Sequence, residues 1–139
     1  MTKNLLIVIA ILFSGTAFAQ TPVYNEAKAY LTYKGYSISK DMYADLKEGE
    51  TTSYTKTFSA NLDYIIIALS DDTDVKDVDV FLYETNGTEY TKDSKAKSMA
   101  IVEFSLMFER ELKVTVKNYK SNSPTYASKC KFIIGYKSK

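Results

Sequence analysis

The sequence predicts a mainly β protein, an antiparallel β-sandwich preceded by one short N-terminal helix. Short apolar or alternating runs follow one another from residue 36 to the C-terminus, and turn-forming residues separate them. Regularly spaced runs of this kind are typical of two-sheet sandwiches. Only one segment has helical periodicity, whereas a parallel α/β fold needs a helix between successive strands. The sequence also lacks the internal repeat of a solenoid or propeller.

Residues 1–19 have the pattern of a secretory signal peptide. Lys3 supplies a positive charge, residues 5–13 form an apolar run too short to span a bilayer, and Ala17-Phe18-Ala19 resembles an A-x-A cleavage site. No cysteine follows the apolar run, so we do not expect a lipoprotein anchor. We expect the mature protein to begin at Gln20, to be secreted or periplasmic, and to have no stable membrane insertion after signal cleavage.

We expect residues 20–45 to form an N-terminal helix and an extension, and residues 46–139 to form one β-sandwich domain. The leader carries one of the 18 basic residues and none of the 17 acidic ones, so the mature chain is neutral. A neutral chain has no overall field that attracts nucleic acid. The lysine-rich residues 91–98 contain no aromatic side chain for base stacking. No nucleic-acid partner is therefore expected.

A short helix is predicted to begin at Asn25, whose side chain can cap it, and to stop at Gly35. Ala27, Tyr30 and Leu31 recur at helical spacing and form one apolar stripe. A helix this short is not stable alone in water, so we expect its apolar stripe to pack on the sandwich.

The first strands are predicted from two different patterns. Residues 36–46 fit either a strand or a helical turn, and the alternation of Tyr36 and Ile38 favours a strand. Residues 64–69 are a short isoleucine-rich run that ends at Ser70, which indicates a buried strand rather than a buried helix.

Val78, Val80 and Leu82 alternate with Asp79, Phe81 and Tyr83, so the three aliphatic side chains are predicted to share the inner face of a strand. Asn86-Gly87 follows, and both residues tolerate positive φ. This pair predicts a type I′ hairpin turn, with the return strand starting at residue 89.

The C-terminal half contains three further alternating strands. Cys130, the single cysteine, alternates with lysines and is predicted to be a small buried hydrophobe rather than a nucleophile. Tyr126 is expected to share its face with Cys130 and Tyr136. The predicted core consists of Val80, Leu82, Val102, Phe104, Val114, Val116, Phe132 and Ile134.

Five carboxylates lie within nine residues and form the candidate metal site: Asp71, Asp72, Asp74, Asp77 and Asp79. Calcium takes several hard oxygen ligands on flexible loops, so this cluster predicts possible calcium binding, with Asp72, Asp74 and Asp77 as the narrower ligand set. The spacing is not that of an EF-hand. The alternative is a solvated turn, because Asp is also a common turn residue.

The order of these features resembles that of the bacterial pre-peptidase C-terminal domain. Residues 77–87 (D-V-D-V-F-L-Y-E-T-N-G) are the best match, and the resemblance covers residues 46–137. The other matching segments are residues 49–58 (G-E-T-T-S-Y-T-K-T-F), 64–69 (Y-I-I-I-A-L), 100–106 (A-I-V-E-F-S-L), 111–118 (E-L-K-V-T-V-K-N) and 126–136 (Y-A-S-K-C-K-F-I-I-G-Y). The resemblance implies a small secreted, jelly-roll-like β-sandwich with an accessory role beside secreted hydrolases.

Catalysis is not expected. The chain has no histidine, which removes the commonest general base and every Ser-His or Cys-His nucleophile pair. It has 12 tyrosines, and Phe81 and Tyr83 are expected to face outward. Exposed aromatic side chains can stack on sugars or anchor a protein partner, unless the helix or neighbouring side chains cover them.

These observations predict an exported, non-catalytic binding or accessory module that holds a polysaccharide or protein partner. The alternative is a structural or assembly component of the cell envelope, acting through edge strands or tyrosine-rich contacts.

Overall fold

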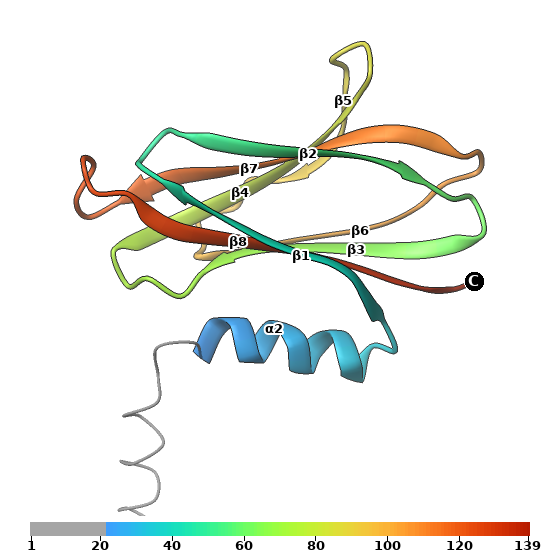
Figure 1. Ribbon diagram of the computed structural model, residues 1–139, viewed down its shortest axis with the longest axis horizontal. Coiled ribbons are helices and arrows are strands. Elements are labelled where there is room, and N and C mark those ends of the chain that lie inside the picture. Colours follow the sequence, from blue (N-terminus) through green and yellow to red (C-terminus); the bar gives the residue numbers. More distant parts are fainter. Residues whose placement is uncertain (1–21) are drawn as a thin grey trace, which may run out of the picture.

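The computed structural model describes residues 22–139, and the predicted signal peptide lies outside them (Figure 1). The described residues form one helix and eight strands. They are α2 (Pro22–Tyr33), β1 (Ser37–Leu46), β2 (Thr51–Phe58), β3 (Leu62–Ser70), β4 (Val75–Glu84), β5 (Glu89–Asp93), β6 (Met99–Ser105), β7 (Arg110–Ser121) and β8 (Ser128–Ser138). Within residues 22–139, no helix has the length and apolar composition needed to cross a membrane.

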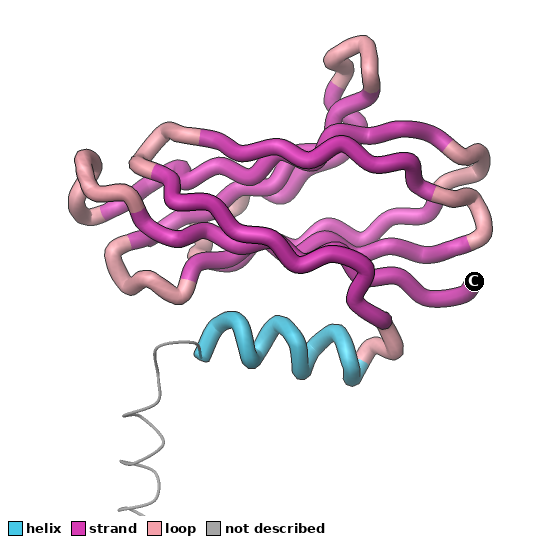
Figure 2. The backbone as a smooth tube through the Cα atoms, in the orientation of Figure 1, coloured by secondary structure: helices cyan, strands magenta, loops and turns pink. Residues whose placement is uncertain are grey.

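The strands pair into two four-stranded antiparallel sheets that stack face to face, which confirms the predicted β-sandwich (Figures 1 and 2). The first sheet has the order β1-β8-β3-β6, and α2 packs on its outer face. We call it the helix-covered sheet. The second has the order β2-β7-β4-β5, and we call it the open sheet.

The favoured strand assignment for residues 36–46 is confirmed by β1, which pairs with β8 from Ser37 to Leu46. This strand is an integral part of the helix-covered sheet. The boundary expected at residue 46 therefore falls inside the sandwich, which starts at Ser37. The local sequence of residues 40–46 does not decide between a strand and a helical turn. Pairing with β8, more than 80 positions away, selects the extended conformation.

The main core lies between the sheets. Register pairs such as Val80 with Val116 and Ile66 with Ile134 place aliphatic side chains in facing layers. The predicted core residues are buried apart from Phe104. Phe104 packs against the core but is partly exposed near the end of β6, an edge strand whose other inward residues, Ala100 and Val102, are buried.

A second, smaller core lies between α2 and the helix-covered sheet. It joins Ala27 and Leu31 of the helix to Ile65, Ile67 and Ile133 of the sheet. Strand β3 contributes to both cores, which explains why its sequence is continuously apolar rather than alternating.

Helix α2 begins at Pro22, three residues before the predicted start, so Asn25 lies inside the helix rather than at its start. Tyr30 is exposed rather than part of the buried stripe. The predicted stop is confirmed: Gly35 has a φ of 82°, and the Tyr36 N–H donates to the Leu31 carbonyl in a Schellman-type ending.

The hairpin between β4 and β5 differs from the predicted type I′ turn. In this turn Gly87 has a positive φ, of 86°, whereas Asn86 does not. The Gly87 N–H donates to the Glu84 carbonyl, and the Glu84 N–H donates to the Thr88 carbonyl. This is a three-residue loop built on a type I turn, in which only the final glycine needs the left-handed conformation.

Cys130 is buried, as predicted, and burial raises the pKa of its thiol to about 12. Its position beside Phe132 and Ile134 in the main core makes it a packing residue. Tyr126, in contrast, is exposed and precedes the first residue of β8, so it does not share the inward face.

Gly135 in β8 allows α2 to approach the sheet. A Cβ atom at this position would lie 2.8 Å from Ile65 Cγ2 and 3.1 Å from Leu31 Cδ2. We expect Gly135→Ala to displace the helix and to cost about 1–3 kcal/mol of unfolding free energy, as overpacking of a core does. Urea unfolding and amide exchange of residues 24–33 measure the two effects.

Gly49→Ala is the matched control for this prediction. A Cβ there meets no atom within 4 Å, and its cost arises from a φ of 86° alone. It should therefore leave amide protection in α2 unchanged. Equal loss of helix protection in both variants would contradict close packing at Gly135.

Candidate functional site

The structure separates the five candidate metal ligands into two groups. Asp71, Asp72 and Asp74 lie at or within the β3–β4 loop, whereas Asp77 and Asp79 lie on β4. Across the described residues 22–139, no three Asp, Glu, Cys or His side chains are placed to share a metal ion. The five carboxylates therefore do not converge, and calcium binding stays a prediction.

The loop carboxylates are engaged in local contacts. Asp72 Oδ1 accepts the Asp74 N–H at 2.9 Å, and Asp74 Oδ2 accepts the Ser123 N–H at 3.3 Å. These bonds fix the turn between the sheets, which agrees with the alternative interpretation of Asp as a turn residue.

Asp71 connects the loop to the helix. Its Oδ1 accepts the Tyr24 N–H at 3.0 Å, in the first turn of α2, where backbone N–H groups have no partner within the helix. Its Oδ2 lies 3.6 Å from Lys131 Nζ, which also sits 4.0 Å from the centre of the Tyr24 ring. Asp71 thus provides a capping acceptor at the N-terminus of α2, the role that was predicted for Asn25.

Asp77 and Asp79 form a nearly buried carboxyl pair. Their exposed fractions are 8% and 3%, and the Oδ1 atom of each has no hydrogen-bond partner. Burial and the neighbouring Asp77 carboxylate together raise the pKa of Asp79 to about 6, while Lys117 on β7 acts in the opposite direction. Neither carboxylate is accessible to a large ligand.

Among the described residues 22–139, no helix lies over the outer face of the open sheet (Figures 1 and 2). Along the edge strand β2, every second side chain is an exposed hydroxyl: Thr51, Ser53, Thr55 and Thr57. We call this the hydroxyl row. Ser53 Oγ lies 2.8 Å from Thr115 Oγ1 on β7, so the row continues across the sheet.

Two aromatic side chains on β4 extend this face. The rings of Phe81 and Tyr83 stack with centres 6.0 Å apart and planes 12° apart, and both are partly exposed. This confirms that they face outward from the main core. Lys113 on β7 places its ammonium 5.7 Å from the centre of the Tyr83 ring.

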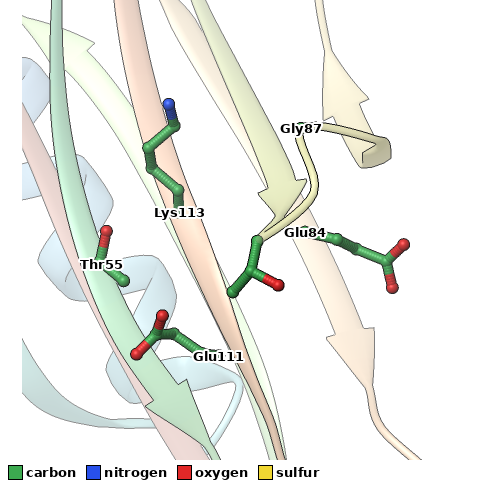
Figure 3. A pocket seen from close by; sticks show the side chains of 6 residues that line it. Thr55, Glu84, Gly87, Glu111 and Lys113 are labelled. Carbon is green, nitrogen blue, oxygen red and sulfur yellow. The ribbon is translucent and has the colours of Figure 1, made fainter.

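An open pocket of about 220 Å³ lies where the hydroxyl row meets the β4–β5 hairpin (Figure 3). Its lining residues are Thr55, Glu84, Thr85, Gly87, Glu111 and Lys113. Thr55 and Lys113 are register partners on β2 and β7, and Glu111 lies two positions before Lys113 on the same face. We call these residues the hairpin pocket.

Glu84 differs from the other lining residues, because its carboxylate accepts from Arg110 at 2.7 Å. In Figure 3 its carboxylate points away from Thr55 and Glu111. The pocket thus contains both charge signs and hydroxyl groups, a composition suited to binding polar ligands rather than to acid–base catalysis.

Phe81 and Tyr83 were predictable from the sequence as outward-facing residues, but the hairpin pocket was not. The available signal was the alternation of hydroxyl residues from Thr51 to Thr57, which marks a strand with a polar outer face. The pocket itself joins β2, β7 and a hairpin that are distant in sequence, so no local pattern identifies it.

The fold and this face define a small antiparallel β-sandwich with one helix-covered and one open sheet. No protein-family model matches the chain, and no curated protein sequence matches it. Solved structures share its fold. Aeromonas hydrophila PliG, a periplasmic lysozyme inhibitor of g-type lysozyme, is 7% identical with a TM-score of 0.52, over 75% of this chain and 90% of PliG.

The pre-peptidase C-terminal domain of collagenase from Bacillus anthracis is 12% identical, also with a TM-score of 0.52, over 68% of this chain and 87% of that domain. The resemblance stated from the sequence is therefore confirmed at the level of fold. At these identities the similarity concerns the fold alone.

Proposed function

We propose that this chain is an exported, non-catalytic binding module that holds a polysaccharide or protein partner on the open sheet. The observation that carries the proposal is the asymmetry of the sandwich. Helix α2 covers one outer face, while the other remains open and carries the hairpin pocket beside an aromatic pair. Partly exposed aromatic groups next to polar ones are a common composition of binding surfaces.

A non-catalytic role is supported by the state of the carboxylates. The chain has no histidine, and the Asp77–Asp79 pair is too buried to reach a substrate. Glu84 is held by Arg110. Glu111 lies in an open, solvated pocket lined mainly by polar and charged residues.

Export is supported by the leader pattern in residues 1–19 and agrees with the fold similarity to a periplasmic inhibitor. That inhibitor acts on a lysozyme, so one protein of this fold binds a protein partner. An accessory role beside a secreted hydrolase follows from the resemblance to pre-peptidase C-terminal domains and forms part of the proposal.

The test uses the mature chain immobilised on beads and a bacterial envelope extract, divided into protease-treated and periodate-treated portions. We expect Tyr83→Ala to reduce retention of the bound component about tenfold, because a central interface aromatic often contributes more than 1 kcal/mol. Loss of binding after periodate identifies a polysaccharide, and loss after protease identifies a protein.

Tyr43→Ala is the matched control, since Tyr43 is 62% exposed but lies on β1 in the helix-covered sheet. It should bind like the unmodified protein. Unchanged binding by Tyr83→Ala, or equal losses in both variants, would show that the open sheet is not the binding face.

A further inference from the structure

We infer that the hairpin pocket takes one sugar unit of a neutral polysaccharide, with the polymer continuing along the hydroxyl row of β2. This inference rests on the proposed function and names the class of ligand. Unused hydrogen-bonding groups, balanced charge, apolar contact area and the size of the pocket support it.

The pocket has hydrogen-bonding capacity that its own residues do not use. Within residues 22–139, neither Glu111 nor Lys113 forms a salt bridge, and the Thr55 hydroxyl faces solvent beside them. A carboxylate accepts, an ammonium donates, and a hydroxyl does both. Sugar hydroxyls also donate and accept, so a sugar ring can satisfy all three groups together.

Charge balance favours a neutral ligand. The pocket presents one carboxylate, Glu111, and one cation, Lys113, whereas the Glu84 carboxylate points away and is neutralised by Arg110 (Figure 3). A polyanion would meet the Glu111 carboxylate, and a polycation would meet the Lys113 ammonium. Neither gains the single-sign field that attracts a charged polymer.

The surroundings fit an extended polymer better than a peptide. Peptides often add to a sheet edge through unpaired backbone groups, but the pocket lies over β7, whose backbone pairs with β2 and β4 on both sides. The stacked Phe81 and Tyr83 rings offer apolar area to a sugar ring, and the hydroxyl row extends away from Thr55 toward Thr51.

The pocket size agrees with one sugar unit. At about 220 Å³ it is smaller than the roughly 300–1,000 Å³ of sites that enclose a drug-sized ligand. Its open side leaves room for the units on either side of the bound one.

The experiment is NMR titration of the isotope-labelled mature protein with four named probes. Three are neutral hexasaccharides, namely cellohexaose, xylohexaose and the fully N-acetylated chitohexaose. The fourth is anionic hexagalacturonate. We expect at least one neutral probe to shift the amide signals of Thr55, Glu111, Lys113 and residues 85–87, with a Kd of about 0.01–1 mM. Hexagalacturonate should bind more weakly than that probe.

Two variants and two controls locate the site. Tyr83→Ala and Glu111→Gln should each weaken binding about tenfold, whereas Tyr43→Ala and Asp45→Asn, on exposed positions of β1, should leave it unchanged. Melting curves of all four confirm that the variants are folded.

Three outcomes would overturn the inference: no shifts with any probe at about 10 mM, tighter binding of hexagalacturonate, or shifts confined to the helix-covered sheet. If sugars fail while Tyr83→Ala still abolishes capture of a protease-sensitive envelope component, the binding-module proposal stands and the ligand class is a protein. If Tyr83→Ala also leaves that capture unchanged, both are wrong.

Discussion

Replacing Phe58 with alanine is expected to lower the free energy of unfolding by about 3–5 kcal/mol, the usual cost of deleting a buried phenyl ring. Phe58 is fully buried at the end of β2. Its ring makes edge-to-face contacts with Tyr64, at a centre distance of 4.8 Å, and with Phe104, at 5.3 Å. The loss is large beside the roughly 5–15 kcal/mol that stabilises a typical domain.

Phe104→Ala is the matched comparison, because it removes the same ring from the same cluster at a partly exposed position. We expect it to cost about 1–2 kcal/mol, since less apolar area returns to water and water can fill the space. Urea unfolding followed by circular dichroism measures both. If Phe104→Ala cost as much unfolding free energy as Phe58→Ala, or more, the difference in burial between the two phenyl rings would be contradicted.

Replacing Asp79 with asparagine is expected to stabilise the protein above pH 6. The pKa of Asp79 in the folded protein, about 6, lies above its ordinary value of 3.8. Between these two pH values, the folded state therefore keeps a proton that the unfolded chain has released. The stabilising contribution is present below pH 4 and is lost as the pH rises through 6. Asparagine stays neutral and can donate to Asp77, so we expect a gain of about 2 kcal/mol at pH 7.5.

The measurement is urea unfolding of both proteins from pH 4 to pH 8 with EDTA present. The variant should show a flatter pH dependence, and the two curves should meet near pH 4. Asp45→Asn, an exposed substitution on β1 with the same charge change, should keep the slope of the unmodified protein. If Asp79→Asn has a lower free energy of unfolding than the unmodified protein at pH 7.5, the raised pKa of Asp79 is contradicted.

The same pair bears on the calcium prediction. If calcium raises the melting temperature of the unmodified protein and Asp79→Asn removes that shift, the β4 pair holds the ion. A shift that instead depends on Asp74 would place the ion in the loop. Ligand binding to the folded state alone raises stability with concentration, so a titration separates these results.

Much of the fold was predictable because it depends on local periodicity. Val80 and Leu82 alternate with outward residues, and this pattern alone specifies one buried face. The isoleucine run likewise indicates a buried strand, and the structure shows that β3 is buried on one face by the helix and on the other by the opposite sheet. Gly35 ends the helix because only a residue tolerant of positive φ fits there.

The errors have a common physical origin in contacts between distant residues. Phe104 follows the same alternation as Val102 but is partly exposed, because burial next to the end of a strand depends on packing from other elements, which the alternation does not report. The acidic residues are adjacent in sequence, yet strand pairing and the loop turn direct Asp71 to the helix and Asp79 to a buried pair. Sequence proximity does not indicate convergence of side chains.

The sequence by itself determined the class of fold, the alternation that builds the main core and the end of the helix, whereas export stays a prediction. Tertiary structure alone decided what caps the helix and where a ligand can bind. Asp71 caps α2 from 47 positions away from Tyr24 because β3 ends beside the first helical turn. The hairpin pocket likewise exists only because β2, β7 and the β4–β5 hairpin become neighbours when the open sheet forms.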